Sequence, residues 1–381
     1  MRILLISNFY PPQMVGGYER AMADYAHLLW ARGHEVHVLT TDVPAFTQPQ
    51  DPRPAGPPIH RTLQLCGQWT GTAFEWLRPA EIAPRVTANA QVLAGLIAQF
   101  QPQVCLMGNI DLLRADILTP LLKAEVPIAH FIMNESPNYP AELAPNSSLY
   151  RYLACSDWVR ERLAEQGYPM QNAVTVHPGA PVQEFYRENL PKRDCLRIAY
   201  ASLLMPYKGP HVLLEALYRL HQNGVEFTAT LAGGSLLPPF VDSLVRTVAE
   251  CGMAECVHFP GTLTRQGLKD LYRSHNILVF PSVFQEPFGI SQVEAMAAGL
   301  TVVSSGTGGA AEIVEDGVSG LIFESENPES LAEALTYLGE NPEDWARLSQ
   351  QGQTRALTVF DQERTVTQLE ALLGEMLVAT D

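Results

Sequence analysis

The chain has 381 residues, more than a single hydrophobic core usually organises, so two domains are expected. With 46% hydrophobic and 17% charged residues, the composition is that of a folded globular protein. The formal net charge of −16 argues against nucleic acid or an anionic membrane surface as a broad partner.

The first half alternates short apolar runs with amphipathic stretches. Residues 2–7 predict a strand, residues 18–33 a helix and residues 34–41 a second strand, which together form the βαβ unit of a parallel sheet. Residues 44–58 contain six prolines and predict an extended surface loop. A helix is expected around 87–100, and further buried strands are expected at 103–107, 127–133, 151–156 and 173–178.

The same alternation restarts after a charged, proline-containing segment at 186–196, which predicts a linker. Strands are expected at 197–203, 227–234, 257–261, 277–282, 301–305 and 320–324, with helices at 209–222, 239–252, 264–274 and 290–298, and from 328 to the end. The pattern predicts an α/β protein with two Rossmann-like parallel-sheet domains, at 1–188 and 189–360, followed by a C-terminal segment, 361–381. Ligands of such proteins usually bind in a cleft between the halves.

No apolar run approaches the ~20 residues of a membrane-spanning helix. The apolar run at the N-terminus is short and leads into a turn, so it predicts a strand and not a targeting segment. Six scattered cysteines suggest a reducing compartment. We therefore expect a cytoplasmic protein, for which peripheral contact with a membrane remains open.

Two carboxylates lie in one of the least polar stretches of the chain, residues 281–300. Glu286 is expected in the loop after a strand and Glu294 on the second turn of the following helix. A buried ionised carboxylate is costly without a partner, and no Lys or Arg occurs between Arg273 and Arg347. Hydroxyl pairs of a sugar or a ribose would supply charge-assisted hydrogen bonds. The alternative is that one glutamate caps the helix and the other reaches solvent.

Other short motifs suit phosphate binding at the ends of strands. Lys208 precedes a glycine between a predicted strand and helix, and Gly16–Gly17 begin the first helix, where free backbone amides favour anions. Each motif alone has an ordinary interpretation as a surface lysine or a turn. The G-x-G-x-x-G pattern of dinucleotide-binding enzymes is missing, which argues against a nicotinamide oxidoreductase.

In chain order these motifs resemble those of a known family. They include "FYPPQMVGGYER", "ACSDWVRERL", "VHPGAPVQEF", "KGPHVLLEAL", "LAGG" and "FPSVFQEPFGISQVEAMAAGLTVVSSGTGG". The pair of glutamates with seven residues between them, followed by A-M-A-x-G, is the most specific of these. The chain resembles the retaining glycosyltransferases of family 4, which have the GT-B fold, over nearly its whole length.

The resemblance implies a UDP- or GDP-sugar donor bound mainly by the second domain and a hydroxyl acceptor (a glycan, a lipid or a small molecule) bound mainly by the first. It implies no cofactor and no metal, and a final helix that packs back on the first domain. By position the implied donor-binding residues are Gly16, Gly17, Ser202, Lys208, Glu286, Phe288, Gly289, Ile290 and Glu294. Glu286, Lys208 and His130 are the catalytic candidates, and Trp69, Asn134 and Glu135 are the acceptor-binding candidates.

Two positions depart from the family pattern. Leu203 stands where the family usually has a second diphosphate-binding arginine. Strict spacing puts Met133, and not His130, where many members have a histidine. His130 is then either a residue of the cleft or a core residue of its strand.

Three alternatives to a glycosyltransferase remain open. A catalytically inactive nucleotide-sugar-binding subunit is suggested by the missing arginine. A nucleotide-sugar epimerase or a glycan phosphorylase would share the fold. Acceptor contacts are expected from the variable region 44–85, where Trp69, Phe74 and Trp76 either stack on a sugar or pack against the protein.

Overall fold

The computed structural model describes residues 1–51, 55–70 and 73–378, and it confirms the predicted α/β class with two parallel sheets. The chain forms two compact units, and each is described by itself. Unit 1 comprises Met1–Gln48, Pro52–Pro178 and Glu363–Asp381. Unit 2 comprises Pro49–Asp51 and Gly179–Gln362.

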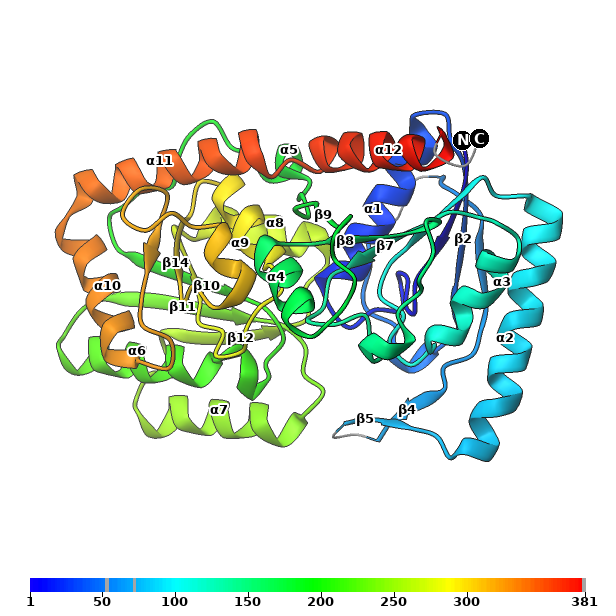
Figure 1. Ribbon diagram of the computed structural model, residues 1–381. Coiled ribbons are helices and arrows are strands. Elements are labelled where there is room, and N and C mark those ends of the chain that lie inside the picture. The colour runs from blue at the N-terminus through cyan, green and yellow to red at the C-terminus, as the bar shows by residue number, and fades with distance from the viewer. Residues whose placement is uncertain (52–54, 71–72, 379–381) are drawn as a thin grey trace. The chain divides into compact units, whose positions relative to one another are not determined.

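Unit 1 is built on a seven-stranded sheet in the order β3-β2-β1-β6-β7-β8-β9, in which all pairs are parallel (Figure 1). Strands β6 and β7 are buried at every residue because helices cover the sheet, so they form continuous apolar runs. The strands are β1 (Arg2–Ile6), β2 (Glu35–Thr41), β3 (Ile59–Leu63), β6 (Val104–Met107), β7 (Ile128–Ile132), β8 (Tyr150–Ala154) and β9 (Val174–Thr175). The helices are α1 (Gly17–Ala31), α2 (Pro79–Phe100), α3 (Thr119–Lys123) and α4 (Asp157–Glu165), with 3-10 turns η1 (Pro44–Phe46), η2 (Ala115–Leu118) and η3 (Ala141–Leu143).

Unit 2 contains a six-stranded sheet in the order β12-β11-β10-β13-β14-β15, also parallel throughout. Its strands are β10 (Leu196–Ala201), β11 (Phe227–Ala232), β12 (Val257–Gly261), β13 (Ile277–Phe280), β14 (Thr301–Ser304) and β15 (Leu321–Ile322). Its helices are α5 (Val182–Phe185), α6 (Pro210–Gln222), α7 (Pro238–Glu250), α8 (Arg265–Ser274), α9 (Ile290–Ala297), α10 (Pro328–Glu340) and α11 (Pro342–Val359), with η4 (Pro206–Lys208) and η5 (Gly308–Glu312). Every predicted strand and helix of this half is present.

Each sheet has one point at which the strand order reverses. In unit 1 this point lies between β1 and β6, and in unit 2 it lies between β10 and β13. The loops that leave the carboxyl ends of the two strands at such a point diverge to opposite faces of the sheet, and ligands of open α/β sheets bind in the crevice between them. Polar side chains at the two switch points are therefore candidates for a ligand-binding or catalytic site.

Sequence analysis missed three strands of unit 1. Strand β3 adds to the sheet edge beside β2, and β4 (Gly67–Trp69) pairs with β5 (Phe74–Trp76) as a separate antiparallel hairpin. These strands are short and follow a proline-rich segment, so periodicity alone gave no signal. Residues 52–54 and 71–72 of the predicted variable region lie outside the described residues.

The last helix, α12 (Gln362–Val378), packs on unit 1. Arg32, at the end of α1, binds the carboxylates of Glu363 at 2.6 Å and Glu370 at 2.9 Å. Arg151 on β8 binds Glu375 at 3.0 Å. None of the helices in the described ranges combines the length and the apolar character that crossing a membrane requires.

Candidate functional site

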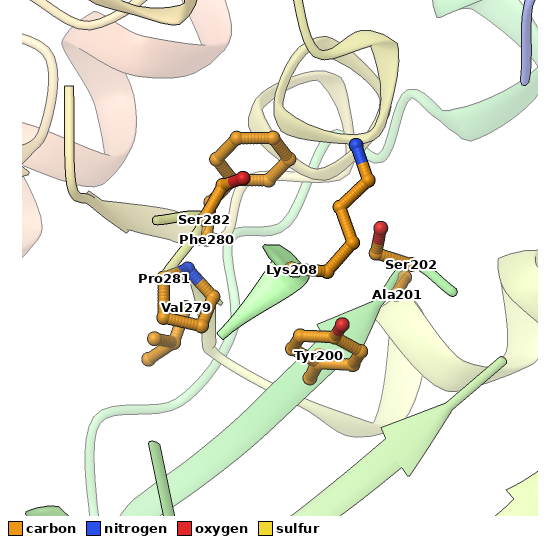
Figure 2. A pocket seen from close by; sticks show the side chains of 8 residues that line it. All are labelled: Tyr200, Ala201, Ser202, Lys208, Val279, Phe280, Pro281 and Ser282. Atoms are coloured by element: carbon orange, nitrogen blue, oxygen red, sulfur yellow. The ribbon is translucent and has the colours of Figure 1, made fainter. Parts of the chain in front are cut away.

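A narrow pocket lies at the switch point of unit 2. It is lined by Tyr200, Ala201 and Ser202 at the end of β10, by Val279, Phe280, Pro281 and Ser282 at the end of β13, and by Lys208. Figure 2 shows the long Lys208 side chain extending along this hollow, with the Ser202 and Ser282 hydroxyls on either side. The pocket therefore joins one cation to two hydroxyl groups at the edge of the sheet where ligands of such folds bind.

The Lys208 ammonium contacts Glu286, one of the two glutamates singled out in the sequence. Lys208 Nζ lies 2.6 Å from Glu286 Oε1, and the Ser282 hydroxyl donates to the same oxygen at 2.5 Å. The side chain of Glu286 is only 6% exposed, whereas that of Lys208 is 17% exposed. This pairing offsets the cost of burying the carboxylate. The Lys208 ammonium also lies over the rings of Tyr207 and Phe284, at 5.3 Å and 5.9 Å from their centres.

Two glycines allow this close arrangement. Gly209 has φ +67°, and a Cβ atom there would lie 1.9 Å from the carbonyl oxygen of Pro281. Gly308 has φ +58°, and a Cβ atom there would lie 2.5 Å from the carbonyl oxygen of Glu286, which also accepts a hydrogen bond from the Gly309 amide at 2.7 Å. Because a side chain at either position would overlap with backbone, these glycines fix the loops that carry Lys208 and Glu286.

Helix α9 begins immediately after the Glu286 loop. Gly289 precedes it with φ +117°, a backbone conformation that glycine adopts most easily, and Ile290 is its first residue. Glu294 lies on the second turn and is buried at 6% exposure, and Phe288 is buried at 4%. The first-turn amides of α9 have no side-chain cap, which leaves a partial positive charge at this end.

Leu203 and Ser202 occupy the end of β10, where the family pattern has an arginine. Ser202 is half-buried, and its amide is bound to the Ala232 carbonyl at 3.2 Å. Lys208 is the one basic residue among those that line the pocket. The structure therefore supplies no second cation from the pocket lining in place of the arginine.

Of the two glycines in unit 1, Gly16 is bound to a carboxylate of the helix that follows it. Glu19 accepts hydrogen bonds from the amides of Val15 at 3.2 Å and Gly16 at 3.0 Å. Glu19 is 1% exposed, and burial raises the pKa of its carboxyl. Gly17, by contrast, is exposed. An anion at this helix end would have to compete with Glu19 for the Gly16 amide.

His130 lies inside unit 1, in the middle of β7. It is fully buried, its Nδ1 is hydrogen-bonded to the hydroxyl of Tyr150, and Tyr139 and Tyr152 pack around its ring. Burial lowers the pKa of His130 to about 3, so the ring is neutral at physiological pH. The catalytic role expected for His130 gains no support from this position.

The acceptor-binding candidates lie in different parts of unit 1. Asn134 follows β7 and donates to both carboxylate oxygens of Asp111, at 3.1 Å and 3.0 Å. Glu135 is half-buried next to it, whereas Trp69 lies on the β4–β5 hairpin. Asp111 was not predicted from the sequence, although its place just beyond β6, next to the switch point, was a usable signal.

Part of the chain is similar to a known family. Residues 182–355 match the model of the glycosyl transferases group 1. A D-inositol 3-phosphate glycosyltransferase of Mycolicibacterium gilvum is 36% identical over 173 residues, which cover 43% of this chain and 38% of that protein. Another, of Streptomyces avermitilis, is 30% identical over 208 residues, covering 50% and 43%. The chain thus spans less than half the length of these curated relatives.

Solved structures agree on the fold. A glycosyltransferase of Rickettsia africae superposes with a TM-score of 0.79 at 17% identity, covering 99% of this chain and 98% of that one. HepE of Anabaena, solved in complex with UDP-glucose, superposes with a TM-score of 0.76 at 20% identity, covering 98% and 100%. The matched segment contains Lys208, Glu286 and Glu294. Residues 182–355 thus match the group 1 glycosyl transferases, and the chain shares the GT-B fold of these solved structures.

Proposed function

We propose that the protein transfers a sugar from a nucleoside-diphosphate sugar to a hydroxyl acceptor, with retention at the anomeric carbon. The observation that carries the proposal is the contact of Lys208 with Glu286 at the switch point of unit 2, within the segment that matches the family. The glycosyltransferase activity of the similar proteins and the UDP-glucose bound to HepE support this choice of donor.

Each group in the pocket has a role in donor binding under this proposal. Lys208 binds the diphosphate, and the free amides at Gly289 and Ile290 add the partial charge of a helix end. Glu286 accepts hydrogen bonds from hydroxyls of the donor sugar, and Glu294 accepts them from the ribose diol. Phe288 directly precedes these two residues in the same backbone segment. Ser202 offers a hydroxyl in the pocket that Lys208 lines. Gly16 and Gly17 are further candidates for phosphate binding on the family resemblance alone.

Retention follows if the acceptor attacks from the face that the diphosphate leaves. The bond between the anomeric carbon and the diphosphate oxygen breaks, and the bond to the acceptor oxygen forms on the same side. The acceptor's proton passes to the departing diphosphate, whose growing negative charge is stabilised by Lys208. Glu286 binds hydroxyls and does not form a covalent intermediate.

Calorimetry with bare nucleotides tests the donor site. UDP and GDP are titrated into the parent, into Lys208→Ala and into Lys269→Ala. Lys269 is a matched control, because it forms an ion pair with Glu184 at 2.8 Å and is exposed to 20%, yet it does not line the pocket. We expect Lys208→Ala to weaken binding of the preferred nucleotide at least about tenfold, as loss of a charge-assisted contact does. Equal affinities for all three proteins would place the diphosphate elsewhere.

Turnover separates transfer from the rival functions, of which the inactive subunit is favoured by Leu203 in place of an arginine. A transferase releases nucleoside diphosphate at a rate that depends on the acceptor, and Lys208→Ala abolishes this release. An epimerase converts the donor sugar without an acceptor. An inactive subunit binds the nucleotide and releases no nucleoside diphosphate with or without the acceptor. This result would refute the proposed transfer.

A further inference from the structure

The switch point of unit 1 carries a cluster of polar side chains centred on Asp111. Its two carboxylate oxygens accept hydrogen bonds from Asn134, and Oδ2 also accepts one from Asn8 Nδ2 at 3.3 Å. Asn8 follows β1, Asp111 follows β6 and Asn134 follows β7, so three neighbouring strands each contribute one group. Asn8 is fixed in turn, because its Oδ1 accepts from the Tyr18 hydroxyl and from the Phe9 amide.

The cluster is costly for the fold. Burial raises the pKa of Asp111 to about 7, opposed by the Asn134 amide and reinforced by the negative charge of Glu19. Beside it, Asn109 is 3% exposed, and its Nδ2 has no hydrogen-bond partner in the part of the chain that the structure describes. An unsatisfied polar group close in sequence to a desolvated carboxylate is unfavourable for stability and calls for a function.

An aromatic hairpin is attached to the loops that carry this cluster. Phe9, the neighbour of Asn8, contacts Phe46 with ring centres 5.2 Å apart, and Phe46 stacks on Phe74 of β5 at 5.6 Å. Phe74 in turn contacts Trp69 of β4 at 5.0 Å. The hairpin is also bound to the loop of Asp111. The amide of Cys66, which precedes β4, donates to the carbonyl of Leu112, the neighbour of Asp111, at 2.6 Å.

The hairpin presents apolar ring faces to solvent. Trp76 is 51% exposed and Phe74 is 38% exposed. Aromatic faces of this kind pack against the C–H face of a sugar or a cyclitol ring, whose hydroxyls point outward from the edge. The hairpin adjoins the loop of Asp111 through the Cys66–Leu112 hydrogen bond, and a carboxylate can accept a hydrogen bond from such a hydroxyl.

The charges at the cluster favour a neutral ligand. The Asp111 carboxylate is surrounded by two uncharged amides and is acted on by a second carboxylate, Glu19. Above about pH 7, where Asp111 is ionised, a phosphate group placed against it would be repelled, whereas a hydroxyl would donate to it. The curated relatives are named for an inositol phosphate, so this chain's cluster suggests a different choice of acceptor.

We propose that Asp111 binds a hydroxyl of the acceptor, and that the acceptor is a neutral polyhydroxylated ring, a sugar or a cyclitol, packed against the β4–β5 hairpin. This inference rests on the proposed transferase function. It assigns Asn8 and Asn134 to positioning the carboxylate, and Trp76 and Phe74 to packing against the ring.

Direct binding tests the role of Asp111 without requiring turnover. Glucose, maltose and myo-inositol, and separately glucose 6-phosphate and inositol 1-phosphate, are titrated by saturation-transfer NMR into the full chain, with and without saturating UDP. We expect a neutral probe to bind the parent, and Asp111→Asn to weaken that binding about 10- to 100-fold, the range for loss of a charged hydrogen-bond partner. Asp116→Asn is the matched control, because Asp116 is an exposed carboxylate paired with Arg114 at 2.8 Å in the same region.

A second pair of variants avoids any change to the buried cluster. Trp76→Ala should weaken the same neutral probe about tenfold, whereas Trp30→Ala, which removes another exposed tryptophan of unit 1, should not. Thermal melting checks that each variant is folded. Tighter binding of the phosphate esters, or equal binding of the neutral probe by the parent, Asp111→Asn and Trp76→Ala, would overturn the inference, as would no binding of any neutral probe.

Binding of UDP and GDP is measured separately from binding of the neutral probe, so the two proposals can fail independently. If Asp111→Asn loses the neutral probe while calorimetry shows unchanged nucleotide affinity, both proposals stand. If the parent binds the neutral probe through Asp111 and binds no nucleotide, the donor assignment fails and the hydroxyl site remains.

Discussion

At the scale of single residues, the most informative contact is that between Lys208 and Glu286. The sequence marked both as donor ligands, one for phosphate and one for sugar, but it gave no reason to place them 2.6 Å apart, because they are 78 positions apart in the chain. Because Glu286 is paired with Lys208, a diphosphate that binds Lys208 must compete with it. Glu294 is not part of this pair, so neutralising Glu286 and neutralising Glu294 should change nucleotide affinity differently.

We predict that Glu286→Gln leaves the affinity for a bare nucleoside diphosphate unchanged or makes it tighter, because Lys208 no longer has a charged competitor, while turnover falls at least about tenfold. Glu294→Gln should instead weaken nucleotide binding by about 1–3 kcal/mol, as expected for loss of a charged partner. Calorimetry with UDP or GDP and a release assay measure the two effects. A similar loss of nucleotide affinity in both variants would contradict this division of roles.

Residue types alone could predict part of this site. The spacing of Glu286 and Glu294 and the Lys-Gly pair were visible in the sequence because they lie on one loop–helix segment or at one strand end. Asp111 was missed because its importance comes from Asn8 and Asn134, which meet it only where three strand ends come together. The burial of His130 could not be predicted either, because the tyrosines that surround it follow it by 9 to 22 residues.

At the scale of elements, the strands at the switch point of unit 2 end in loops that glycine holds together. Gly209 and Gly317 have nearly the same backbone angle, φ +67° and +68°, but different surroundings. A Cβ atom at Gly209 would overlap with the Pro281 carbonyl oxygen at 1.9 Å, whereas one at Gly317 would meet nothing within 4 Å. A comparison of alanine substitutions at Gly209 and Gly317 therefore separates two free-energy costs, that of the backbone angle and that of the overlap with the Pro281 carbonyl.

We predict that Gly317→Ala lowers the free energy of unfolding by about 1 kcal/mol, the cost of a left-handed angle for an L-residue. Gly209→Ala should lower it by a further ~2 kcal/mol or more, because the loops at Lys208 and Pro281 must separate. It should also reduce nucleotide binding, since Lys208 moves. Chemical unfolding of the two variants gives the comparison, and equal losses would mean that the loop shifts freely.

At the scale of the whole molecule, the chain leaves unit 1 after Pro178 and returns to it at Glu363, within helix α12. Arg32 holds this helix through Glu363 and Glu370, and His34 contacts Glu370 at 2.8 Å. The hydrogen bond from His34, followed by that from Arg32, lowers the pKa of the Glu370 carboxyl below its ordinary value. The helix is therefore tied to unit 1 by a small ionic network as well as by its buried face.

The sign of the pH effect follows from that lowered pKa. Above the ordinary carboxyl pKa of 4.5, Glu370 is ionised in the folded and unfolded chain, and its contacts stabilise the fold fully. As the pH falls through the lowered folded pKa, the carboxyl takes up a proton and this contribution is lost. We predict that Glu370→Gln destabilises the protein by up to about 1 kcal/mol at pH 6, and by progressively less as the pH falls below 4.5, after allowance for its partial exposure.

Hydrogen exchange along α12, followed between pH 3 and pH 6 in the parent and in Glu370→Gln, measures this effect locally. Adding about 1 M salt should narrow the difference at pH 6, because it screens exposed charges. A difference between the two proteins that grows toward acid pH would contradict the assignment.

The sequence by itself determined the fold class, the alternation of strands and helices in unit 2, the resemblance to a family and the glutamate pair. These features are local: buried parallel strands form continuous apolar runs, and a loop–helix motif keeps its residues within a dozen positions. Tertiary structure alone decided the partner of Lys208, the burial of His130, the use of the Gly16 amide by Glu19, and the cluster at Asp111 with its aromatic hairpin. Each of these depends on strand order in a parallel sheet, which brings together the ends of strands that are far apart in the chain.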